Sequence, residues 1–441
     1  MSDLPTTSTD APGLVPGDHG DRASRVLDDA DLRAEHWRDL YRDLHAHPEL
    51  SGREHRTAAA FAAELRASGL EVTEGVGGTG VVGLLRNGDG PTVMLRADMD
   101  GLPILEETGL PYQSRHTDVS PAGETVPTMH ACGHDMHVTA LAAAVDTLAG
   151  ARHSWHGTLL VVGQPAEETA AGASSMLEDG LFTRFPKPDV ALGQHVGPLP
   201  AGVANHSREL LMAASSTLDV TIHGRGGHGS MPQVTVDPIL TAAYAITRLQ
   251  AIAARETAAD DPVVVTVGTF HAGTKSNIIP DDATFTVNLR ARSDASMDRA
   301  VAAVRRIVEA EAAAARCPQP PSIGIRENPP ATVNTAAVVD RVMAAQRAVM
   351  PEGSVRIAAP LMGSEDFSEF GLPQGRYPGA PVPYAFWFWG GMAPERFPAD
   401  YTTGFSPSVP GNHTAQFAPL DEPTIAAGRR LMVAAALEFL G

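Results

Sequence analysis

The chain has 441 residues, of which 43% are hydrophobic, and this is enough for two domains with buried cores. Its 33 lysines and arginines against 52 aspartates and glutamates give a formal net charge of -19. Because no basic cluster offsets this charge, we expect neither nucleic acid nor an anionic membrane as a partner. No apolar run reaches the ~18 to 20 residues of a membrane helix, and no signal-peptide layout opens the chain. These features predict a cytoplasmic protein that acts on a small molecule.

The first elements expected along the chain are a tail and two helices. Residues 1–30 are rich in Ser, Thr, Asp, Pro and Gly and poor in aliphatic side chains, so we expect a flexible tail. From Asp31, apolar side chains recur at three- and four-residue spacing as far as Pro48, where proline ends a helix. A second helix is expected at residues 57–68.

Three short apolar runs follow, and each precedes polar residues. They are residues 92–96 before Asp98, residues 158–162 before Glu167, and residues 190–192 before His195. An alanine-rich stretch between the first two predicts a helix, so the order strand, helix, strand favours a parallel sheet with right-handed crossovers. Ligands of such sheets gather at the carboxyl ends of the strands, where these polar residues are expected.

The middle of the chain predicts a second, smaller unit. Strands are expected at residues 217–222, 262–269, 283–290 and 322–325, and helices at residues 238–255 and 297–316. This strand-helix-strand-strand-helix-strand order is that of a ferredoxin-like module. We therefore expect an α/β protein in which residues 31–213 and 328–441 form the catalytic domain and residues 214–327 form an inserted lid. The aromatic run at 384–390 is interpreted as a buried strand, with a substrate pocket as the alternative.

Residues 129–137, with the sequence MHACGHDMH, are the most informative segment. They place Cys132 beside several imidazoles, and the only other cysteine is Cys317. No second Cys/His pair at zinc-finger spacing follows. Candidate ligands scattered along the chain therefore predict a catalytic metal centre assembled by the fold.

A centre of two divalent ions needs a bridging anion, and a cysteine thiolate fits because a metal deprotonates a coordinating thiol. The alternative for Cys132 is a small buried apolar residue. His137 either lines the following helix or supports the ligands from behind.

Glu167 and Glu168 follow a strand, where consecutive side chains point in opposite directions, so one can bind metal while the other faces the water. A solvated acidic pair is the alternative. Asp98 can orient a ligand histidine.

Other candidates are weaker when each is taken alone. Asp100 can orient a histidine as Asp98 does, or it simply forms a turn before a glycine. His195 and His413 are isolated, and isolated histidines are more often satisfied polar residues. His228 lies in a glycine-rich loop that allows close backbone approach to a ligand, but the loop matches no phosphate-binding pattern.

Taken together, seven segments resemble peptidase family M20, and more narrowly its amidohydrolase branch of aminoacylases, hippurate hydrolases and auxin-conjugate hydrolases. The segments are RADMDGLP at 96–103, CGHD at 132–135, EE at 167–168, GQH at 193–195, HGS at 228–230, NIIP at 277–280 and GSEDF at 363–367. The likeness runs from about Trp37 to the C-terminus. It implies a zinc-peptidase-like catalytic domain with a mixed, largely parallel sheet, and a ferredoxin-like lid that mediates homodimerisation.

The resemblance also implies the roles of individual residues. The implied metal ligands are Cys132 as the bridge, with His134, Glu168, His195 and His413. Glu167 is implied as general base and acid, and His228 as a group that reaches a substrate oxyanion, often across the dimer. Asn277 and Arg290 are implied anchors for the substrate carboxylate, and a surface position is the alternative for Arg290.

One departure from the wider family is informative. Many of its peptidases have His-x-Asp where this chain has Arg96-Ala97-Asp98, and an aspartate where it has Cys132. We therefore expect His134 to replace the missing histidine, which is the pattern of the amidohydrolase branch. The expected partition is Cys132, Glu168 and His413 on one ion, and Cys132, His134 and His195 on the other. Zinc, manganese, cobalt and nickel all stay open.

The expected reaction is hydrolysis of the amide bond of an N-acyl amino acid. A metallo-dipeptidase with the same centre is the alternative within this chemistry. A cysteine hydrolase, with Cys132 as nucleophile and His134 as base, would survive a chelator and would leave the two adjacent glutamates without a role. A silent binding protein is disfavoured by the intact Glu167.

Overall fold

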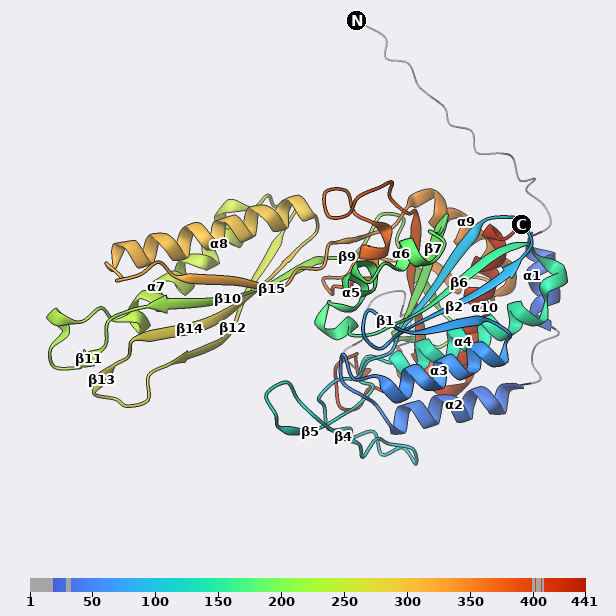
Figure 1. Ribbon diagram of the computed structural model, residues 1–441, viewed down its shortest axis with the longest axis horizontal. Helices are drawn as coiled ribbons and strands as arrows, with labels where there is room; N and C mark the ends of the chain where they lie inside the picture. Colours follow the sequence, from blue (N-terminus) through green and yellow to red (C-terminus); the bar gives the residue numbers. More distant parts are fainter. Residues whose placement is uncertain (1–18, 29–32, 399–400, 402–405, 407) are drawn as a thin grey trace, which may run out of the picture.

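The computed structural model describes residues 19–28, 33–398, 401, 406 and 408–441. Its two main sheets lie one beyond the other along the long axis of the molecule (Figure 1). The larger sheet and its helices come from the two outer parts of the sequence. The smaller sheet, at the left of the figure, comes from the middle part.

The larger sheet has eight strands in the order β1-β2-β6-β3-β7-β18-β8-β17. In chain order they are β1 (Glu71–Val76), β2 (Gly80–Asn87), β3 (Thr92–Asp98), β6 (Gly157–Gln164), β7 (Val190–Pro200), β8 (Ala204–His206), β17 (Val355–Ile357) and β18 (Tyr384–Met392). The central strands β6, β3, β7 and β18 run parallel to one another. β1 is antiparallel to β2, β2 is antiparallel to β6, and β8 is antiparallel to β18. The mixed, largely parallel sheet expected from the sequence is confirmed.

The central strands are apolar throughout because both faces of the sheet are covered. In β3, Val93, Leu95 and Ala97 belong to the core on one face, and Met94 belongs to the core on the other face. β18 has all nine residues buried, as the aromatic run predicted.

Helices cover both faces of the larger sheet (Figure 1). They are α1 (His19–Asp28), α2 (Ala34–Ala46), α3 (His55–Ala67), α4 (His134–Gly150), α5 (Gly172–Glu178), α6 (Leu181–Arg184), α9 (Ala336–Val349) and α10 (Asp421–Phe439). Within the described ranges, none of the helices combines the length and the apolar composition that crossing a bilayer requires. The cytoplasmic location expected from the sequence stays a prediction.

The smaller sheet is antiparallel, with the order β12-β14-β10-β15. Its strands are β10 (Ala214–His223), β12 (Val263–Ala272), β14 (Asp282–Ala291) and β15 (Ser322–Glu327), and α7 (Pro238–Ala251) and α8 (Asp294–Ala314) pack on one face. This is the ferredoxin-like order that the sequence predicted. The boundaries at 213/214 and 327/328 stay a prediction. A short ribbon, β11 (Gly227–His228) with β13 (Ile278–Ile279), lies at the far end of this unit (Figure 1).

Two further minor pairs complete the described strands. β4 (Thr117–Val119) pairs with β5 (Thr125–Pro127), and β9 (Leu210–Met212) pairs with β16 (Thr332–Val333) where the chain passes between the two sheets.

The flexible tail expected at residues 1–30 is wrong in part. Residues 1–18 lie outside the described residues, but residues 19–28 form α1, which packs against α9 and α10. Ala23, Val26 and Leu27 are buried because they share one face at three- and four-residue spacing. Arg22 also donates hydrogen bonds to the Leu437 and Leu440 carbonyls near the end of α10. The low aliphatic content of this segment hid a single apolar face.

Candidate metal centre

The turn that carries Cys132 depends on the glycine after it. Gly133 has φ +85°, and a Cβ atom there would lie 2.4 Å from Cγ1 of Val196. Only glycine tolerates both the left-handed conformation and this close approach. The turn therefore brings Cys132 against β7, beside His195, and α4 begins at the next residue, His134.

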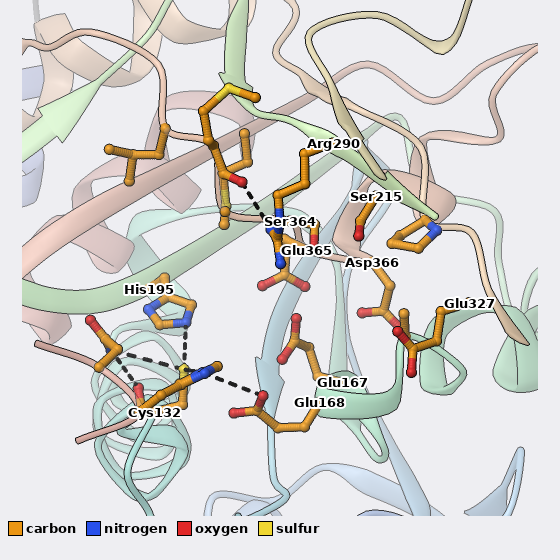
Figure 2. Close-up of a pocket in the computed structure, with 18 of the residues that line it drawn as sticks. Cys132, Glu167, Glu168, His195, Ser215, Arg290, Glu327, Ser364, Glu365 and Asp366 are labelled. Atoms are coloured by element: carbon orange, nitrogen blue, oxygen red, sulfur yellow. Dashed lines mark hydrogen bonds and ion pairs between the residues drawn. The ribbon is translucent and has the colours of Figure 1, made fainter. Parts of the chain in front are cut away.

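The two glutamates lie in a 3-10 turn and not at the end of a strand. β6 ends at Gln164, and Ala166, with φ +50°, redirects the chain into Glu167–Thr169. The alternation of side chains along a strand therefore does not explain how one glutamate could bind metal while the other faces the water. Both side chains nevertheless line the same cavity, where Figure 2 shows them facing Cys132 and His195.

The first donor set joins Cys132, Glu168 and His413. The Nε2 atom of His413 lies 3.2 Å from the sulfur of Cys132 and 3.4 Å from Oε2 of Glu168. His413 itself has φ +67°, and its N–H donates to the Ala131 carbonyl at 2.8 Å.

The second donor set joins Cys132, His134 and His195, whose ligand atoms lie within 4.8 Å of one another. Nε2 of His195 is 3.4 Å from the same sulfur. Nδ1 of His195 bonds the Val196 carbonyl at 2.8 Å, so a neutral ring presents its Nε2 lone pair to the site. Burial, and then the neighbouring His137, hold the pKa of His195 well below its usual value. Both sets are those expected from the sequence, and they share one sulfur.

Two buried atoms in this region fit a bound cation. In the described part of the chain, neither Nε2 of His134 nor Oε1 of Glu168 has a hydrogen-bond partner, and they lie 3.9 Å apart. A buried polar atom without a partner costs about 1 to 3 kcal/mol, so such atoms usually serve a ligand. The set of thiolate, imidazole and carboxylate donors suits a divalent transition metal.

Asp100, and not Asp98, holds the ring of His134. Oδ1 of Asp100 lies 3.1 Å from Nδ1 of His134, and its Oδ2 accepts from the Glu168 N–H at 3.0 Å. Burial lowers the pKa of His134, but Asp98 and Asp100 outweigh it and raise the pKa to about 10. The negative surroundings therefore favour a positive charge at this position.

The role expected for Asp98 needs a correction. Its Oδ2 is 3.6 Å from Nε2 of His134, which is too far for a hydrogen bond. Its Oδ1 instead bonds Nδ1 of His137, whose Nε2 accepts from the Val196 N–H at 2.8 Å. His137 thus has both nitrogens satisfied, and it supports the ring of His195, 4.5 Å away between ring centroids.

Arg96 is fully buried behind the centre and neutralises several carboxylates. It lies 2.8 Å from Asp98 and from Glu365, and 3.4 Å from Asp366. Glu365 also lines the cavity. The pKa of Glu167 is raised well above its usual value, first by burial and then by the charge of Glu365.

A cavity of about 580 Å³ opens over these residues (Figure 2). The larger sheet and its loops contribute the candidate ligands. The smaller sheet contributes Ser215, Asn288, Arg290 and Glu327, and apolar contacts come from Met212, Leu361 and Phe388. Nη1 of Arg290 donates to the Met362 carbonyl at 2.8 Å. Arg290 therefore faces the cavity and not open solvent.

His228 and Asn277 lie elsewhere. Among the described residues that line the cavity, neither is present, and both are exposed at the β11–β13 end of the smaller sheet. Nδ1 of His228 bonds the hydroxyl of Ser230 at 2.9 Å, and the Asn277 carbonyl accepts from the Gly229 N–H. One copy of the chain does not bring these two residues to the candidate ligands.

Some residues that support the site through other residues were not predicted from the sequence. Asn412 donates from Nδ2 to the carbonyls of Cys132 and Val196 at 3.1 and 3.2 Å, and so ties the His413 segment to the centre. Its position directly before His413 was the available signal. Phe388 shows that the aromatic strand is both buried and part of the pocket wall.

The environment of Cys132 disfavours a cysteine nucleophile. Burial, followed by the charges of Glu168 and Glu167, raises the pKa of its thiol well above the usual value. Reactive cysteines have the opposite shift. A thiolate at this position needs cations beside it.

A family model, curated relatives and solved structures match this chain over most of its length. The family model described as peptidase family M20/M25/M40 matches residues 94–393. A hippurate hydrolase of Campylobacter jejuni is 37% identical over 345 residues, which cover 77% of this chain and 86% of the relative. The Arabidopsis thaliana protein IAA-amino acid hydrolase ILR1-like 2 is 35% identical over 336 residues, covering 75% and 73%. The crystal structure of the Bacillus subtilis YXEP protein, described as a dinuclear metal binding peptidase from the M20 family, matches with TM-score 0.70 and 26% identity, covering 92% and 97%.

The fold and these relatives define a metal-dependent hydrolase of amide bonds. The chain belongs to peptidase family M20/M25/M40, as the seven segments indicated.

Proposed function

We propose that this protein hydrolyses the amide bond of N-acyl amino acids, releasing a carboxylate and a free amino acid, at a centre of two divalent ions. The observation that carries the proposal is the pair of donor sets that share the sulfur of Cys132. The resemblance to a hippurate hydrolase and to an IAA-amino acid hydrolase supports this substrate class.

Each ion would take one donor set. Cys132, Glu168 and His413 would hold the first ion, and Cys132, His134 and His195 the second. Bound ions would lower the pKa of a water molecule and polarise the scissile carbonyl. The donors suit zinc, manganese, cobalt or nickel, and one thiolate among imidazoles and carboxylates does not choose between them.

Glu167 would move the proton. Its carboxylate is buried at the cavity, with Oε2 3.8 Å from Nε2 of His134, and burial raises its pKa, which makes the carboxylate a stronger proton acceptor. It would take a proton from the attacking water and deliver it to the leaving amine. Asp98 would contribute through His137, which it orients.

The substrate carboxylate would meet Arg290, whose guanidinium offers several donors in the cavity. The acyl group would pack on the apolar wall that includes Met212, Leu361 and Phe388.

His228 and Asn277 would complete the site from a second copy of the chain. We propose a homodimer through the smaller sheet, in which His228 stabilises the substrate oxyanion and Asn277 helps to bind the carboxylate. Large apolar side chains exposed on α7 and β12 support an interface there: Leu240 is 55% exposed, Tyr244 61% and Phe270 40%.

A metallo-dipeptidase is the second candidate, because the Bacillus subtilis YXEP protein is described as a peptidase. The two functions differ in what the pocket accepts next to the scissile bond. A dipeptide carries a free, charged α-amine there, whereas an acylated amino acid carries an apolar group.

The test joins metal analysis to a substrate panel. Purified protein should contain divalent metal, lose turnover on chelation, and regain it with Mn²⁺ or Zn²⁺. Acetyl, benzoyl and long-chain acyl amino acids should be cleaved with higher kcat/KM than dipeptides with a free α-amine. Faster cleavage of the dipeptides would favour the second candidate, and full turnover in the presence of chelator would overturn both.

A further inference from the structure

His45 lies in a fully buried ionic bridge outside the donor sets. Its Nδ1 is 2.7 Å from Oδ2 of Asp135, and its Nε2 is 3.0 Å from Oε1 of Glu106. None of the three side chains is exposed. Burial lowers the pKa of His45, but the hydrogen bonds to the two carboxylates outweigh it and raise the pKa to about 9. An imidazolium therefore joins two carboxylates from different segments.

The Asp135 arm reaches the start of α4. Asp135 directly follows the candidate ligand His134, and its Oδ1 accepts from the Met136 N–H at 2.8 Å. Its carbonyl accepts from the Thr139 hydroxyl at 2.8 Å. The bond from His45 therefore fixes the turn of backbone that carries His134.

The Glu106 arm reaches the segment that carries His413. The N–H of the next residue, Glu107, donates to the Ala415 carbonyl at 2.8 Å. The Glu107 carboxylate accepts from Nε2 of Gln416, also at 2.8 Å. Residues 415 and 416 lie just after His413, so His45 connects both ligand-bearing segments through two short paths.

We propose that His45 is a positioning residue that holds the His134 segment and the His413 segment at the spacing the two ions require. His45 touches neither the candidate ligands nor the cavity. The inference rests on the metal centre proposed above. Groups that hydrogen-bond a metal ligand directly change metal affinity about 10- to 100-fold when they are removed, and His45 acts one contact further out, so we expect an effect at the lower end of this range.

The test measures metal binding to the full-length protein and not only turnover. Metal-free His45→Gln and Glu106→Gln should be titrated calorimetrically with Mn²⁺ and with Zn²⁺. His45→Gln should bind roughly 10-fold more weakly than the wild type. Glu106→Gln keeps the bond from His45 to Asp135 and should weaken binding less. His47→Gln is the matched control, because the His47 side chain is 46% exposed, hydrogen-bonds the Asp43 carbonyl and contacts the His116 ring, and has no bond to Asp135 or Glu106 among the described residues.

A second readout separates positioning from a purely structural role. If His45 acts through the metals, excess Mn²⁺ or Zn²⁺ should restore most of the kcat of His45→Gln while KM stays near the wild-type value. Wild-type metal affinity in a His45→Gln protein that merely melts at a lower temperature would overturn the inference.

Two further outcomes would also test the role of His45. If His45→Gln does not fold, Glu106→Gln decides alone, and unchanged affinity there overturns the inference. A wild-type protein that takes up no metal would overturn the proposed function and this inference together, whereas failure of the inference alone leaves wild-type binding intact.

Discussion

The sulfur of Cys132 lies 3.2 Å from Nε2 of His413, although 281 positions of sequence separate the two residues. The same sulfur lies 3.4 Å from Nε2 of His195. One side chain thus belongs to both donor sets, and removing it should damage both at once.

Cys132→Ser should therefore lose most of its bound metal and reduce kcat/KM by roughly 100-fold or more, because a hydroxyl is a poor bridging anion compared with a thiolate. Metal content by mass spectrometry and turnover on a benzoyl amino acid check this. Cys317→Ser is the matched control, since Cys317 packs against the core of the smaller sheet. Full metal content in Cys132→Ser would show that the sulfur of Cys132 is not a metal ligand.

Glu167→Gln should keep the metal and reduce kcat by about 10² to 10⁴-fold, because an amide cannot carry the proton between water and leaving amine. KM should change little. The measurement is steady-state kinetics together with metal content. Glu178→Gln, an exposed position on α5, serves as control. A Glu167→Gln enzyme with near-normal kcat would exclude Glu167 as the general base.

His228→Ala alone should reduce turnover about 10² to 10³-fold, the usual cost of one oxyanion donor. If His228 acts across a dimer, mixing His228→Ala with Glu167→Gln and allowing subunit exchange should restore about a quarter of wild-type turnover, since half of the dimers then contain one complete site. An exchange confirmed by mass spectrometry without recovery of turnover would argue that His228 does not work in trans.

His206 should make the fold acid-sensitive. It is buried against Gln346 and Trp387, and burial lowers its pKa to about 4. A free histidine has a pKa of about 6.5, so the unfolded chain binds the proton first as the pH falls. The free energy of unfolding should therefore be unaffected by the titration of His206 above about pH 6.5. Between about pH 6.5 and pH 4 it should decrease by up to about 1.4 kcal/mol per pH unit.

His206→Gln removes this titration. Its melting temperature should fall less steeply than that of the wild type between pH 7 and pH 5, as measured by calorimetry. Parallel curves for the two proteins would contradict the assignment. His153→Gln, an exposed position near the end of α4, controls for the loss of an ordinary histidine.

The sequence predicted the central strands well because their residues are buried on both faces, which produces continuous apolar runs. It placed His195 after a strand, whereas β7 continues to Pro200. The reason is tertiary: β18 pairs alongside β7 over nearly its whole length, so polar residues remain within a strand that a local pattern would end.

The candidate ligands were predictable from motifs, but their supporting residues were not. Asp98 and Asp100 both follow the apolar run of β3, and only the path of the turn decides which carboxylate reaches His134. The link from Asn412 to Cys132 likewise depends on two distant loops meeting. Side chains that act through long-range contacts leave no local periodicity.

The β9–β16 pair joins both connections between the two sheets into one hydrogen-bonded ribbon. The incoming and outgoing strands are therefore tied to each other between the two sheets. Arg290, on β14 of the smaller sheet, donates to the Met362 carbonyl at 2.8 Å, so its guanidinium links the smaller sheet to the opposite wall of the cavity. A carboxylate that bound Arg290 would compete with the Met362 carbonyl for the same donor and would thereby act on this contact between the two units.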